Sequence, residues 1–319
     1  MLFDVWRDAT ETMRSPMRIT AAVALLTFVM TMNIQAQTKP ERPKISGLRF
    51  VRIGVGDIES ASRFYNGQLH LPRMGDSCFN QDSVCFFIGI DQQIDLVKTD
   101  SAKQRNLIEM IGLCTSDVGA LRKYLLARGQ SPGEIITDSE GRIFFQVKDP
   151  EQHTIEFVEW PKGGVGGSMS GMPPISRHMI HAGFIVKDRA AMDKFYKDIL
   201  GFHLYWSGGM KDGETSWVSM QVPDGTDWIE YMLNIDPNAD QHLRGVMNHI
   251  ALGVPSVKEA AIQLEKNGVK LTEQPKIGRD GKWQLNLYDP DLTRVELMEF
   301  TPVEKPCCSE FTGTHPKQF

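Results

Sequence analysis

The sequence has few cysteines, little net charge and no long apolar run, and each scarcity excludes a class of protein. Only five cysteines occur in 319 residues, without Cys-x-x-Cys spacing, which argues against a zinc ribbon or a disulfide scaffold. The net charge of −5 is small and evenly spread, which argues against binding to nucleic acid or to an anionic membrane. We therefore expect a small-molecule partner, and any bound metal must use histidine and carboxylate ligands.

The N-terminal segment has the pattern of a secretory signal. Arg14 and Arg18 precede an apolar run from residue 21 to residue 30, and a polar stretch follows. This run has about half of the ~20 residues that a membrane helix needs. We therefore expect residues 1–36 to be a signal peptide cleaved near Ala36, a protein exported to the periplasm or secreted, and no stable membrane span.

Turn-forming residues divide the remaining chain into two halves. At roughly 100–200 residues per domain, the length predicts two domains. Glycine and proline are concentrated between residues 161 and 174, which predicts an interdomain linker. The predicted organisation is a spacer at 37–46, a first domain at 47–160, a linker at 161–176, a second domain at 177–302 and an irregular tail at 303–319.

One pattern recurs four times: an alternating strand, a turn with Asp or Ser, an amphipathic helix, and short strands of which the last carries an acid. The reference positions in the four first strands are Phe50, Met110, His181 and His249. The acids of the four closing strands are Asp95, Glu156, Glu230 and Glu296. Each acid follows its first-strand position by 45 to 49 residues, so we expect these pairs to occupy equivalent places. Two units in each half would place their first and last strands around one cavity.

The second half carries potential metal ligands at all of its equivalent positions, which are His181, Glu230, His249 and Glu296. Two imidazoles and two carboxylates suit a divalent ion of Zn, Ni, Mn or Fe(II) and leave positions open for water or substrate. A single histidine or acid is more often a surface or core residue, so the prediction depends on their joint placement. The first half has Phe50, Asp95, Met110 and Glu156 instead, which cannot form this site. We predict one metal ion, in the second half.

These features resemble the vicinal oxygen chelate superfamily, the group of glyoxalases, bleomycin resistance proteins and extradiol dioxygenases. The resemblance covers both halves, and each half ends on the family's Asp-Pro…Glu strand, at Asp149…Glu156 and Asp289…Glu296. It implies an α+β fold of two tandem domains, each built from a pair of βαβββ units that form a half-open barrel. Members often dimerise, so the resemblance also allows a homodimer.

Within this superfamily, the second half is most similar to glyoxalase I (lactoylglutathione lyase). The segment from His181 to Phe202 resembles the opening signature of that enzyme, and the segment 228–234 resembles its first acidic-ligand strand. The likeness implies a metal-dependent lyase or isomerase that forms a metal-stabilised enediolate on a small substrate with vicinal oxygens. Its implied catalytic residues are Glu296, as the base, and Glu230.

Three residues near Glu230 are predicted to contact the substrate because their strand borders the cavity. They are Trp228, Tyr231 and Asn234. Packing inside the protein is an equally good interpretation for them, especially for the two aromatic residues.

Two other functions in the superfamily remain open. Glyoxalase I usually has an arginine four residues after its first histidine ligand, where it binds a glutathione carboxylate, and this chain has Ile185 there. An Fe(II) extradiol-type ring-cleaving dioxygenase would use the two histidines and Glu296, but Glu230 adds a fourth ligand where that enzyme type binds O2. A metal-free protein that sequesters a small molecule, such as an antibiotic, needs no metal ligands. The presence of four potential metal ligands, and their spacing in the sequence, favour the lyase or isomerase.

Overall fold

The computed structural model describes residues 40–74, 83–100, 106–159 and 173–317. The predicted signal peptide, residues 1–36, lies outside the described residues. So do the start of the predicted spacer, most of the predicted linker and the last two residues of the tail. No helix in the described ranges combines the length and the apolar character needed to cross a membrane.

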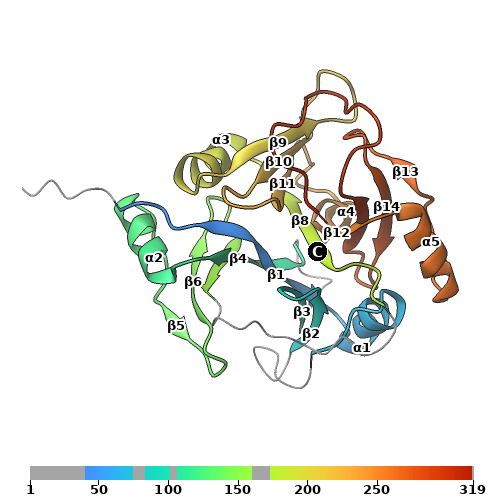
Figure 1. Cartoon of the computed structure of the whole chain (residues 1–319), viewed down its shortest axis with the longest axis horizontal. Helices are drawn as coiled ribbons and strands as arrows, with labels where there is room; N and C mark the ends of the chain where they lie inside the picture. The colour runs from blue at the N-terminus through green and yellow to red at the C-terminus, as the bar shows by residue number, and fades with distance from the viewer. Residues whose placement is uncertain (1–39, 75–82, 101–105, 160–172, 318–319) are drawn as a thin grey trace, which may run out of the picture. The chain divides into compact units, whose positions relative to one another are not determined.

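The first half forms a mixed sheet of seven strands (Figure 1). Its elements are β1 (Ile45–Val55), α1 (Ile58–Ser62), η1 (Arg63–Gln68), β2 (Ser83–Ile88), β3 (Gln92–Lys98), β4 (Ile108–Thr115), α2 (Val118–Ala127), β5 (Ile136–Thr137), β6 (Ile143–Lys148) and β7 (Thr154–Glu159). The strand order is β2-β3-β1-β4-β7-β6-β5, with β1 and β4 antiparallel at the centre. Among the described residues, the strand expected before β2 is reduced to a bridge between Arg73 and Phe86.

The second half repeats this arrangement in a sheet of eight strands. Its elements are β8 (His178–Ile185), α3 (Arg189–Asp193), η2 (Lys194–Ile199), β9 (His203–Gly208), β10 (Trp217–Gln221), β11 (Trp228–Met232), α4 (Gln241–Met247), β12 (His249–Val254), α5 (Val257–Lys266), β13 (Lys276–Ile277), β14 (Trp283–Tyr288) and β15 (Arg294–Glu299). The order is β13-β14-β15-β12-β8-β11-β10-β9. Both halves therefore have the predicted α+β architecture of tandem half-open barrels.

The turn that recurs in all four units is a helix N-cap. Its side chain accepts a hydrogen bond from the backbone N–H three residues later, which satisfies a donor that the first helical turn leaves free. The four capping residues are Asp57, Asp117, Asp188 and Ser256. Helices α1 and α3 then continue into the short π-helical segments η1 and η2, a detail that the apolar spacing does not predict.

The two Asp-Pro turns are structural, as predicted. Asp149 accepts hydrogen bonds from the backbone N–H groups two and four residues later, at 2.9 Å each. Asp289 does the same at 3.0 and 2.8 Å. Each carboxylate also accepts a hydroxyl from the other half, Asp289 from Tyr65 at 3.1 Å and Asp149 from Tyr196 at 3.2 Å. The turns therefore set the closing strands and link the two halves.

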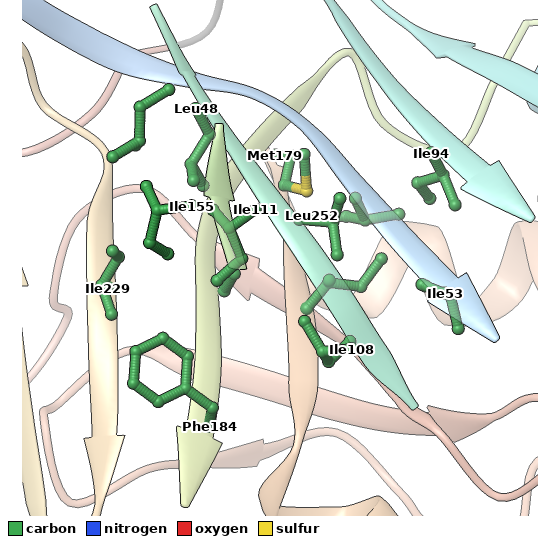
Figure 2. Packing of buried hydrophobic residues seen from close by; sticks show 14 of the residues in the cluster. Leu48, Ile53, Ile94, Ile108, Ile111, Ile155, Met179, Phe184, Ile229 and Leu252 are labelled. Atoms are coloured by element: carbon green, nitrogen blue, oxygen red, sulfur yellow. The ribbon is translucent and has the colours of Figure 1, made fainter. Parts of the chain in front are cut away.

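The main hydrophobic core is shared by the two sheets. Figure 2 shows Leu48 and Ile111 of the first sheet near Met179 and Leu252 of the second, and all four belong to one buried cluster. The side chain of Gln92 bonds both backbone groups of Met179, at 2.9 and 2.6 Å. Because side chains alternate along a strand, each sheet turns its other face away from this core.

Candidate metal centre

Four predicted ligands meet on that other face of the second sheet, on the neighbouring strands β11, β8, β12 and β15. His181 Nε2 lies 3.0 Å from His249 Nε2. Glu230 Oε2 lies 3.9 Å from His181 Nε2 and 3.3 Å from His249 Nε2. Glu296 Oε2 lies 3.6 and 3.9 Å from the same two atoms. Donors bound to one ion at ~2.1 Å are about 3.0 to 4.2 Å apart, so the separations between each carboxylate and the two histidines fit a single ion. The donors that all lie within 4.8 Å of one another are those of His181, Glu230 and His249, and Glu296 lies beside this group.

The protonation pattern of the histidines also suits a metal. His249 Nδ1 lies 3.0 Å from the Met247 carbonyl oxygen, which can only accept, so Nδ1 carries the proton and Nε2 offers its lone pair to the cluster. Both rings are fully buried, and burial lowers the pKa of His181 and of His249 well below the ordinary value. Neutral imidazoles that converge on carboxylates can hold a metal ion, and His181, Glu230 and His249 form such a group.

Gly183 makes room for one of these rings. It lies opposite His249 in the antiparallel pair β8/β12 and opposite Glu230 in the parallel pair β8/β11. A Cβ atom at position 183 would lie 2.1 Å from His249 Cε1 and 2.9 Å from its Nε2. The imidazole therefore occupies the space that any side chain at this position would need.

We expect Gly183→Ala to weaken Zn²⁺ binding by at least ~10-fold, because the added methyl group displaces the ring that carries a donor atom. Gly112→Ala is the matched control, since its Cβ would lie 2.2 Å from the Phe50 ring in the first half. Both variants should lose stability, but only Gly183→Ala should lose affinity in a calorimetric titration with Zn²⁺. Equal affinities would contradict this role of Gly183.

A cavity of about 440 Å³ opens beside the cluster. Glu230 and Glu296 form part of its wall, so a bound molecule can reach the donor atoms. Trp206, Trp217 and Phe311 give it an aromatic side. The cavity therefore suits a small molecule with an apolar part and oxygen atoms for the cluster.

The C-terminal tail contributes to this cavity. It forms no helix or strand in its described part, as predicted, yet it is held along β9: the Thr312 N–H donates to the Tyr205 carbonyl at 3.0 Å, and Tyr205 Oη lies 2.5 Å from His315 Nδ1. The small cysteine number gave no reason to expect a disulfide, but the adjacent Cys307 and Cys308 are bonded to each other. Periodicity cannot reveal a segment whose order comes from tertiary contacts.

Of the three residues predicted to contact a substrate, the structure places one in the cavity wall and two elsewhere. Trp228 lines the cavity and packs on His181, with ring centroids 4.7 Å apart. Tyr231 belongs to the main hydrophobic core, because residues next to each other in a strand point to opposite faces. Asn234 has a positive φ of 62° and donates to the Thr215 carbonyl at 3.0 Å, so it shapes the end of β11 and does not line the cavity.

The equivalent place in the first half holds a protein cation. Arg52 is the first-half equivalent of Gly183. It lies opposite Met110 in the first sheet, just as Gly183 lies opposite His249 in the second. Its Nη2 lies 3.4 Å from Asp95 Oδ2, so a guanidinium neutralises the acid that corresponds to Glu230. The first half therefore has a protein cation, Arg52, at the place where the second half could hold a metal ion.

Sequence reasoning missed several charged residues around the cavity. Arg294 and Asp280 line it. Lys282 is fully buried and donates from Nζ to Tyr205 Oη at 3.0 Å, and burial lowers the pKa of this lysine to about 8. The only signal for Arg294 was its place two residues before Glu296, which puts both side chains on one face of β15.

Comparisons with known proteins agree with this architecture. The profile of the Glyoxalase/Bleomycin resistance protein/Dioxygenase superfamily matches residues 178–297. No curated relative matches the sequence. Among solved structures, the 2,3-dioxygenase LapB from Pseudomonas sp. KL28 is similar, with a TM-score of 0.63 and 18% identity over 87% of this chain and 96% of that chain.

Homoprotocatechuate 2,3-dioxygenase from Brevibacterium fuscum, in complex with 3,4-dihydroxyphenylacetate, is also similar. Its TM-score is 0.63 and its identity 16%, over 85% of this chain and 86% of that chain. At this identity the likeness establishes the fold, and it extends over both halves. The second half of the chain therefore matches the Glyoxalase/Bleomycin resistance protein/Dioxygenase superfamily, and both halves together share the fold of two extradiol dioxygenases.

Proposed function

We propose that the chain is a metal-dependent enzyme, a glyoxalase I-like lyase or isomerase that moves a proton on a small substrate with two adjacent oxygens. The observation that carries this proposal is the second carboxylate of the cluster. Glu230 Oε2 lies 3.3 Å from His249 Nε2, in addition to Glu296 on β15. With two carboxylates beside the imidazole pair, one can hold an ion while the other exchanges a proton with the substrate.

The roles follow from the surroundings of each group. His181, His249 and Glu230 would hold a divalent ion, which would supply Lewis acidity at a substrate carbonyl and so acidify the neighbouring carbon. Glu296 is the base, with Oε2 as the accepting atom, because burial raises its pKa to about 7, where a carboxylate can both take and return a proton. Glu230 is more accessible, with a side chain 13% exposed, and assists from β11.

Metal binding is expected to release protons below neutral pH. Since the pKa of Glu296 is about 7 and its Oε2 lies 3.6 Å from His181 Nε2, a divalent ion beside it displaces the carboxyl proton in mildly acidic solution, whereas the imidazoles are already neutral. We expect roughly one proton per Zn²⁺ at about pH 6 and almost none at about pH 8.5, and hence tighter binding as the pH rises. Calorimetry in buffers of different ionisation enthalpy measures this number. Glu296→Gln should abolish the release, and a persistent release would assign it to another group.

A second candidate is an extradiol-type ring-cleaving dioxygenase. The structures of two such enzymes cover both halves of this chain, which supports this alternative. Elemental analysis followed by assays with a hemithioacetal, and with catechol under air, separates the candidates. Proton transfer on the hemithioacetal supports the lyase or isomerase, and Fe(II)-dependent opening of catechol supports the dioxygenase. A protein that binds no metal would overturn both and favour a binding protein.

We further propose that the protein is exported. The arginines and apolar run of the N-terminal segment support this. The bonded pair Cys307–Cys308 adds support, because disulfides persist in oxidising compartments. Protein recovered from the periplasm or the medium should begin after residue 36. Uncleaved protein confined to the cytoplasm would contradict the proposal.

A further inference from the structure

One cation in the cavity wall, Arg294, differs from the others in its contacts. Within the described residues, the Arg294 guanidinium forms no hydrogen bond or ion pair, and its Nε atom is buried without an acceptor. The other two cations of the wall differ in this respect. Lys276 Nζ lies 2.9 Å from Glu273 Oε2, and Arg279 pairs with Asp212. Arg294 is therefore the wall cation whose hydrogen-bonding groups remain available.

Arg294 stands next to the donor cluster. It lies opposite His249 in the parallel pair β12/β15, and it precedes Glu296 by two residues, so both side chains face the cavity. A molecule that reaches the cluster from the cavity therefore also reaches the guanidinium.

The charges of the cavity leave Arg294 uncompensated once an ion is bound. Glu230 and Glu296 together balance a divalent ion. Asp280 lies beside the buried ammonium of Lys282, whose charged form it stabilises. The remaining cations already have acidic partners, as described above. A ligand with one negative charge would complete the balance.

We propose that the cavity binds a small carboxylic acid, whose carboxylate pairs with Arg294 and whose apolar body packs against Trp206, Trp217 and Phe311. Guanidinium and carboxylate match each other through two parallel hydrogen bonds, which are stronger than neutral ones. The inference rests on the proposed function, because the acid is the class of substrate that this site would act on. It adds that the substrate is an anion.

A pair of probes that differ in charge tests this. The carboxylate 1-naphthylacetate and the neutral 1-naphthylacetamide have nearly the same shape, and calorimetry measures their affinities for Zn²⁺-loaded protein. We expect the acid to bind the native protein at least ~10-fold more tightly than the amide, and this ratio to fall below ~3 in Arg294→Gln. Arg294→Lys should retain part of the preference. Arg189→Gln, an exposed change of equal charge on α3, should retain all of it.

Each contrary outcome has a distinct meaning. Equal binding of acid and amide by the native protein would overturn the inference, and so would an acid preference that persists in Arg294→Gln, because the metal alone would then bind the carboxylate. Unchanged circular dichroism and the binding of one Zn²⁺ per chain establish that Arg294→Gln is folded. The two proposals can fail separately. If the protein binds no Zn²⁺ at all but still prefers the acid through Arg294, only the proposed function is overturned.

Discussion

Replacing His181 by alanine is expected to abolish stable metal binding. The purified native protein should contain about one ion per chain, and the variant close to none after dialysis, with an affinity lowered by more than ~10²-fold, since even outer-shell partners of a ligand contribute ~10–100-fold. The change removes an Nε2 donor that lies within 3.9 Å of both carboxylates of the cluster. Elemental analysis and competition with a chromogenic chelator measure the loss.

The control for this prediction is another histidine on the same sheet. His203 Nε2 lies 3.0 Å from Gln221 Oε1 and belongs to no cluster of metal ligands among the described residues. His203→Ala should keep the native metal content. If His181→Ala keeps its ion as well, the ion is bound elsewhere, and the proposed cluster is wrong.

The cluster was predictable because it depends on the internal repeat. Each unit presents one first-strand position and one closing acid, and the parallel pairing of these strands brings the two together. Sequence spacing therefore carried three-dimensional information for His181, Glu230, His249 and Glu296. The same spacing also showed that Phe50 and Met110 break the set in the first half, although it gave no sign that Arg52 supplies a cation there.

Other features depend on contacts between segments with no common pattern. Tyr231 lies in the hydrophobic core although it is next to Glu230 in the sequence, because alternation puts neighbouring residues on opposite faces of β11. The tail is ordered by hydrogen bonds to β9 and by contact of Phe311 with Tyr205, at a centroid distance of 4.8 Å. The availability of Arg294 depends on which acids other cations contact. Neither the order of the tail nor the availability of Arg294 has a periodic signature.

Glu296→Gln is expected to lower kcat by about 10²–10⁴-fold, the usual contribution of a positioned general base. The amide keeps an oxygen that can bind an ion, so metal content should fall less than in His181→Ala. It cannot accept the substrate proton, however, so the variant should lose the proton-transfer step more than it loses metal binding. Turnover of a hemithioacetal, and exchange of its transferable hydrogen with deuterated water, measure the effect alongside the metal content.

The first half offers the matched control for this change. Glu156 occupies the equivalent closing strand, and its Oε2 accepts a hydrogen bond from Gln146 Nε2 at 3.0 Å. Glu156→Gln removes the same charge from the same place in the repeat, so it should leave kcat within about twofold of the native value, because surface and structural changes act through stability and not through the reacting atoms. Glu230→Gln should lie between the two. If Glu230→Gln costs more than Glu296→Gln at equal metal content, the base is Glu230, and the proton leaves the substrate on the side of β11.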